Sequence, residues 1–80
     1  MRVERQLPLA FALEDYIAMK TRDLIKMIEA DGWHLERVKG SHHIYKHPTK
    51  EGTLSLPVHS LGKDVAIGIE RSILRQAGLR

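Results

Sequence analysis

Three short segments rich in strand-forming residues are joined by very short links, and this feature constrains the fold more than any other. The segments are 33–38, 42–47 and 53–58, and the links are the Gly40-Ser41 turn and residues 49–52. Glycine takes a positive φ without steric cost, so Gly40-Ser41 predicts a tight turn. A parallel return would need a crossover of about a dozen residues or more, which these links are too short to provide. The sequence therefore predicts a three-stranded antiparallel sheet.

A helix is expected on each side of the strands. The first begins near Thr21, whose hydroxyl we expect to cap free backbone N–H groups, and it ends at Gly32. The last helix begins at Val65 or Gly68 and runs to Ala77, with an apolar stripe at helical spacing. That stripe consists of Val65, Ile69, Ile73 and Leu74. Two helices need an apolar surface to cover, and one face of the sheet supplies it. The predicted fold class is α+β, in the order α-β-β-β-α with both helices on one face.

Strict alternation predicts which strand side chains share a face. In the first strand it groups Trp33 with Leu35 and Arg37. In the second strand it groups His42 with Ile44, at the rim of the face covered by the helices, and it puts His43 with Tyr45 and His47 on the opposite face. A rim position would let packing fix the His42 ring.

The length of 80 residues allows one domain with a thin core. We expect residues 1–18 to be an N-terminal extension outside the core fold and residues 19–80 to form the domain. The alternative is that residues 1–18 add an amphipathic helix that packs on the domain or on a second copy. The chain has no cysteine, which fits a reducing cytosol. It has no apolar run of about 18 residues, which excludes a membrane span, and a cytoplasmic location is expected.

Basic side chains exceed acidic ones, giving a net charge of +3. A small domain with this excess tolerates phosphate-rich partners, although the same charges can serve only solubility. The candidate phosphate contacts are Lys39, Lys46, Arg71 and His59, with Lys50 and Arg75 as further basic positions. Trp33 and Tyr45 are candidates for stacking on bases, and we expect at least one of them to belong to the core.

The pair His42-His43 follows directly after the predicted turn. Histidine has an unperturbed pKa near neutrality, so an imidazole held at a strand opening suits proton transfer. We prefer His42 as the catalytic residue, with His43 as the alternate; the competing interpretation is a surface pair without a role. Neutral imidazoles also bind zinc, but the sequence contains no HExxH or CxxC spacing, so no metal site and no cofactor are predicted.

Several short motifs recur together along the chain. They are Asp31-Gly32-Trp33, Lys39-Gly40-Ser41-His42, Tyr45, His47-Pro48, Pro57-Val58-His59 and the run 73–79, Ile-Leu-Arg-Gln-Ala-Gly-Leu. In this order and spacing, residues 20–79 resemble the HicA (YcfA-like) toxin family. The resemblance implies a fold similar to a double-stranded-RNA-binding domain. It also implies an mRNA interferase that is the toxin of a bacterial toxin–antitoxin pair.

The resemblance also implies roles for particular residues. Catalysis would rest on His42, supported by the Gly40-Ser41 turn, and some members carry the histidine one place later, at the position of His43. The partner would be a HicB antitoxin that blocks this histidine. Residues 1–18 and the loop 62–68 depart from the family pattern.

The implied chemistry is metal-independent cleavage of mRNA, in which a histidine transfers a proton and cations steady the phosphate. The rival class is a non-catalytic RNA-binding module of the same fold, and a third interpretation is a structural protein whose basic face meets an acidic partner. Neither a small-molecule cofactor nor a membrane partner is expected, and homo-oligomerisation stays open.

Overall fold

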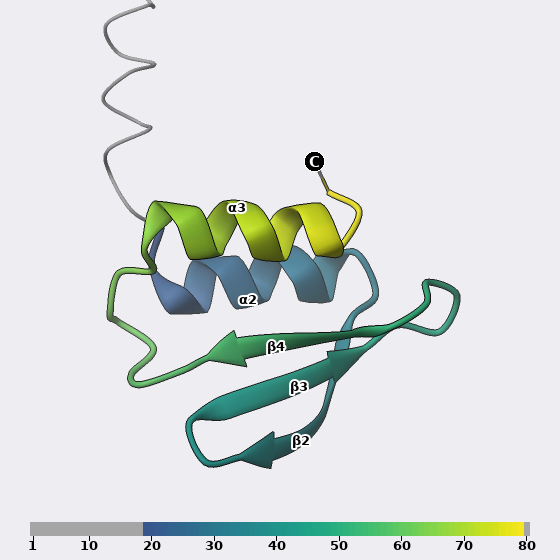
Figure 1. Ribbon diagram of the computed structural model, residues 1–80, viewed down its shortest axis with the longest axis horizontal. Coiled ribbons are helices and arrows are strands. Elements are labelled where there is room, and N and C mark those ends of the chain that lie inside the picture. The colour runs from purple at the N-terminus through teal and green to yellow at the C-terminus, as the bar shows by residue number, and fades with distance from the viewer. Residues whose placement is uncertain (1–18, 80) are drawn as a thin grey trace, which may run out of the picture.

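The computed structural model describes residues 19–79, so the prediction for residues 1–18 lies outside the described part of the chain. The elements are α2 (Thr21–Ala30), β2 (His34–Lys39), β3 (His42–Lys46), β4 (Thr53–Pro57) and α3 (Ile67–Gln76). Figure 1 shows the two helices side by side on one side of the sheet. The predicted α+β class and the order α-β-β-β-α are confirmed.

The sheet is antiparallel with the strand order β2-β3-β4, so β3 is central. The helices lie nearest to β4, and β2 is the strand farthest from them (Figure 1). All six side chains of β2 are exposed, which agrees with that position. The core therefore takes its strand residues from β3 and β4, while β2 extends beyond it.

The strand register fixes which face the helices cover. Tyr45 lies opposite Leu54, and His43 lies opposite Leu56. Tyr45, Leu54 and Leu56 are all buried, so this is the covered face. His42 has the other parity and lies on the opposite face, which we call the open face. The prediction that His42 sits at the rim of the covered face is wrong, because Tyr45 rather than Ile44 packs into the core. Side chains alternate along a strand, so His42, which shares a face with Ile44, points away from the helices.

A β-bulge in β2 overturns a second prediction. The pairing with β3 shifts between Leu35 and Arg37, which leaves Glu36 as an extra residue. Beyond the bulge, Val38 returns to the face of Leu35, while Arg37 lies opposite Ile44 on the open face. The predicted grouping of Leu35 with Arg37 is therefore wrong, because strict alternation does not survive an inserted residue.

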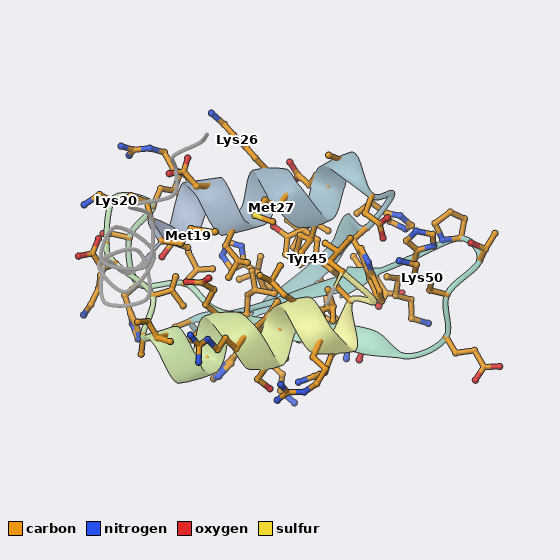
Figure 2. The ribbon with its side chains drawn as sticks, turned by 90° about the horizontal axis from the view of Figure 1, so that it is seen from above. Met19, Lys20, Lys26, Met27, Tyr45 and Lys50 are labelled. Atoms are coloured by element: carbon orange, nitrogen blue, oxygen red, sulfur yellow. The ribbon has the colours of Figure 1, made fainter. Side chains whose placement is uncertain are left out.

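The core contains both large aromatic rings. Trp33 and Tyr45 are each buried, so neither can stack on a base in this fold, and the expectation that at least one belongs to the core is confirmed. Seen from above, Tyr45 lies between the two helices (Figure 2). The Trp33 indole N–H donates to the carbonyl oxygen of Ala77 at 3.4 Å. The remaining core residues are Leu24, Ile28, Leu54, Leu56, Val65, Ile73, Leu74 and Ala77.

The helix ends differ in part from the prediction. The Thr21 hydroxyl donates to the Lys63 carbonyl at 2.9 Å, and α2 has no side-chain cap, so the predicted Thr21 cap is wrong. This hydrogen bond instead ties the start of α2 to the loop before α3. Gly32 has a φ of 110°, which confirms the predicted helix stop. Ile69, predicted to be buried, is 41% exposed.

Candidate functional site

The candidate site lies at one end of the molecule, which we call the hairpin end. It comprises the β2–β3 turn, the end of β4 and the loop 58–66 (left side of Figure 1). Gly40 has a φ of 62°, and a Cβ there would meet nothing within 4 Å, so its backbone conformation rather than space requires glycine. The Ser41 carbonyl accepts a hydrogen bond from the Val58 N–H at 2.7 Å. The predicted Gly40-Ser41 turn is thus tied to the loop that follows β4.

His42 is exposed on the open face, which also carries three cationic side chains, Lys39, Arg37 and Lys46. It lies directly opposite Lys39 on β2 and opposite Pro57 on β4. Residues directly opposite across antiparallel strands have Cβ atoms about 4.5–5.5 Å apart, so the Lys39 ammonium can reach a group bound at the His42 ring. Lys46 lies on the same face, further along β3. The structure therefore places Lys39 beside His42, and Lys46 on the same face at the far end of β3.

An acidic residue moderates the charge of the open face. Through the bulge, Glu36 reaches two of the cations: Arg37 Nη1 lies 3.2 Å from Glu36 Oε1, and Lys46 Nζ lies 3.9 Å from Glu36 Oε2. Both pairs are exposed, and exposed pairs are worth only about 0–1 kcal/mol, so a phosphate can compete for these cations. Lys39 lies beside His42, at the other end of the open face from Lys46.

His43 has different surroundings. It is half-buried on the covered face, between Val38 on β2 and the buried Leu56 on β4. Its ring is thus better held than that of His42 but less open to a large substrate. The two adjacent histidines therefore face opposite sides of the sheet.

The other predicted phosphate contacts lie apart from Lys39 and Lys46. His59 is exposed in the loop after β4, at the hairpin end. Arg71 is exposed on α3, in the helical layer on the other side of the sheet from the open face. The structure does not bring Arg71 together with His42.

The opposite end of the molecule holds a polar cluster that the sequence reasoning missed. His47 Nδ1 accepts hydrogen bonds from the N–H groups of Thr49 and Lys50 at 3.0 and 3.1 Å. A neutral imidazole has one donor and one acceptor, so Nε2 carries the proton and donates to the Asp31 carbonyl oxygen at 2.7 Å. A Cβ on Gly32 would lie 2.8 Å from the same Nε2. His47 therefore fastens the β3–β4 loop to the end of α2.

Lys50 extends this cluster to the other helix. Its ammonium donates to Asp31 Oδ2 at 2.5 Å and to the Ala77 carbonyl oxygen at 2.9 Å. Figure 2 places Lys50 at the end of the molecule where the helices finish. The hydrogen bond from Lys50, helped by the positive charge of Lys50, lowers the pKa of the Asp31 carboxyl. We call Asp31, His47 and Lys50 the histidine clamp, and within it Lys50 has a structural role in place of the expected phosphate contact.

The motifs Asp31-Gly32-Trp33 and His47-Pro48 were the only sequence signal for the clamp. These motifs contain Asp31 and His47, but they do not indicate that the two residues are in contact or that Lys50 joins them. Within residues 19–79, no three His, Asp or Glu side chains are grouped so that they could hold a metal ion. No helix in that part of the chain is long and apolar enough to cross a membrane.

The comparison with protein families agrees with the motifs. Residues 21–79 match the family model described as HicA toxin of bacterial toxin-antitoxin. This match spans the whole described fold from the start of α2 to the residues after α3. No curated protein matches the chain.

Proposed function

The chain belongs to the HicA toxin family of bacterial toxin–antitoxin systems, and from this premise we propose that it is an mRNA interferase neutralised by a HicB-type antitoxin. HicA toxins are in general mRNA interferases that pair with antitoxins. The observation that carries the proposal to particular residues is the exposed imidazole of His42, set on the open face directly opposite Lys39.

The proposed reaction needs one proton removed and one proton supplied. The ribose 2′-oxygen loses its proton and attacks the adjacent phosphorus. The bond from phosphorus to the 5′-oxygen breaks, and that oxygen takes up a proton. The products are a 2′,3′-cyclic phosphate and a 5′-hydroxyl. His42 performs one of the two transfers, which is typically worth about 10²–10⁴ in rate.

Lys39 and Lys46 are the proposed phosphate contacts on the open face. Lys39 lies beside His42 and suits the reacting phosphate, whose negative charge it offsets. Lys46 is four residues along β3, or about 13 Å away at roughly 3.3 Å per residue, so it suits a phosphate further along the strand. Arg71 and His59 would meet other parts of the RNA.

His43 is the alternate catalytic residue. Partial burial between Val38 and Leu56 restrains its ring, which favours a well-positioned acid or base. Access favours His42, because a phosphodiester flanked by riboses needs open surface around the attacking group. The reason that now supports His42 is therefore its exposure beside a cation, and not the packing expected from the sequence.

The proposal is tested by incubating the antitoxin-free protein with a single-stranded RNA in EDTA. We expect cleavage with 2′,3′-cyclic phosphate ends, and no cleavage of the same strand carrying 2′-deoxyriboses. Cleavage that requires added metal would refute the metal-independent chemistry. Binding of RNA without cleavage would reduce the protein to an RNA-binding module.

A further inference from the structure

A cavity of about 270 Å³ opens at the hairpin end and is not used by the chemistry described above. It lies between the end of β4, the start of α2 and the loop that leads into α3. Its walls include Pro57, Val65, Ala66 and Ile69, and its polar groups include His59 and Lys63. It is slightly smaller than the roughly 300–1,000 Å³ of sites for drug-sized ligands, so it suits a single planar ring system.

The cavity reaches the strand next to the proposed catalytic residue. Pro57, which forms part of its wall, is the residue directly opposite His42 in the sheet. Neighbouring strands lie about 4.7–4.9 Å apart, so the backbones of Pro57 and His42 are close. The hydrogen bond from the Val58 N–H to the Ser41 carbonyl holds this spacing on the side of the turn. The cavity itself lies on the helix side of β4, with Thr21 of α2 and Ile69 of α3 in its walls, whereas His42 faces the open face. An RNA strand whose phosphate lies at His42 therefore has to pass around the end of β4 to bring an adjacent nucleotide to the cavity.

The walls have the composition of a site for a ring that carries a charged tail. Pro57, Val65 and Ile69 offer an apolar surface, and Ile69 is 41% exposed although its helical spacing predicts a core position. His59 and Lys63 supply hydrogen-bond donors beside that surface. The carboxylate of Asp64 also borders the cavity, but Lys20 Nζ lies 3.0 Å from Asp64 Oδ1 and offsets its charge. Apolar walls with a few placed polar groups are typical of ligand sites.

We propose that this cavity binds the base of the nucleotide next to the cleaved bond, with His59 and Lys63 contacting its sugar or phosphate. The inference rests on the proposed function, because it takes the strand path from His42. It assigns to the loop 58–66 a role in choosing which RNA sequences are cleaved. A base that fits the cavity would be preferred on one side of the cleaved bond.

The test uses the full chain and fills the cavity from its edge. Ala66 is exposed and lies at the start of α3, at the edge of the cavity, so Ala66→Trp adds a ring from the solvent side. A second variant, His59→Ala with Lys63→Ala, removes the polar contacts and leaves the apolar walls. Lys26→Ala is the charge-matched control for the lysine, because Lys26 points away from the fold on α2 (Figure 2). Unchanged melting temperatures establish that each variant is folded.

Two readouts separate this inference from the proposed function. One is cleavage of RNAs that differ only in the nucleotides flanking the cleaved bond, and the other is binding of a short RNA with a 2′-deoxyribose at that bond. We expect Ala66→Trp to lower cleavage about tenfold and to alter the preferred flanking base, as removal of an apolar subsite does. The double variant should weaken binding of the short RNA, and Lys26→Ala should change neither readout.

Other outcomes have defined meanings. Cleavage by the unmutated chain, with an unaltered rate and base preference in both cavity variants, overturns the inference and leaves the proposed function standing. If the unmutated chain does not cleave RNA, the proposed function fails. In that case weaker RNA binding by Ala66→Trp still supports the cavity as an RNA site, whereas unchanged or absent RNA binding overturns the inference. Loss of neutralisation by the antitoxin, with RNA cleavage and binding intact, assigns the cavity to the antitoxin and overturns the inference.

Discussion

The substitution Gly32→Ala tests the histidine clamp, because two separate costs meet at this residue. Gly32 has a φ of 110°, a conformation that costs a side-chain-bearing residue about 1–3 kcal/mol. An added Cβ would also lie 2.8 Å from His47 Nε2, so the ring must move. Movement of the ring weakens the hydrogen bond to the Asp31 carbonyl and the two that Nδ1 accepts, each worth about 0.5–1.5 kcal/mol.

Together these effects predict a loss of about 2–5 kcal/mol in the free energy of unfolding, which in a domain of this size lowers the melting temperature by on the order of 10 °C or more. Gly52→Ala is the matched control, since Gly52 has a φ of 83° but nothing within 4 Å of its added Cβ. It should show the backbone cost alone.

Thermal or urea unfolding of a double-mutant cycle separates the two costs. In a His47→Ala background the collision is absent, so Gly32→Ala should cost no more than Gly52→Ala does. The coupling between Gly32 and His47 should then be at least about 1 kcal/mol. Equal losses for the two glycines in the unmutated background, or additive effects of Gly32→Ala and His47→Ala, would refute the clamp as the reason for this glycine.

Three further predictions concern RNA binding, pH and the chain terminus. The affinity for single-stranded RNA should fall with salt, and Lys39→Ala and Lys46→Ala should each reduce the slope of log affinity against log salt concentration by about 0.7, the value for one phosphate contact. An unaltered slope would show that the replaced lysine does not contact a phosphate. The lowered pKa of the Asp31 carboxyl contributes stability that is present above the unfolded pKa near 3.8 and is lost as the pH falls through the folded pKa. The free energy of unfolding of Asp31→Asn, measured with urea, should therefore vary less with pH in that acid range than that of the unmutated chain. An unaltered dependence on pH would contradict the Lys50–Asp31 pairing. Deletion of residues 1–18 should leave cooperative thermal unfolding with a midpoint within about 8 °C, since the described core and clamp lie within 19–79, and a larger fall would show that the extension packs on the domain.

The order of elements could be predicted because it follows from local chemistry. Gly40-Ser41 fixes a turn, Gly32 stops a helix, and short links leave only antiparallel pairing. The assignment of faces could not be read in the same way. Both Ile44 and Tyr45 are apolar, and only the meeting of Tyr45 with Leu54 under the helices decides which parity is buried.

The candidate site was predictable in its members more than in its arrangement. The position of His42 directly after the turn singled it out, and the register with Lys39 follows from a tight hairpin. The bulge at Glu36 leaves no local signature, yet it determines that Arg37 reaches the open face. The clamp and the cavity join residues that are far apart in the sequence, such as Asp31 with Lys50 and Pro57 with Ile69, so they depend on tertiary contacts that spacing cannot reveal.

The most direct test of the account is the rate of RNA cleavage, in the absence of antitoxin, by three variants that each replace one histidine. His42→Ala should lose about 10²-fold or more while keeping its melting temperature and its RNA affinity within a few-fold, because an exposed ring contributes little to packing. His34→Ala is the matched control, since His34 is also exposed on the open face, opposite Lys46 and away from the turn, and it should cleave at the unmutated rate. His43→Ala should cost less than His42→Ala. Full activity in His42→Ala together with loss in a folded His43→Ala would contradict the account and move the proton transfer to the covered face.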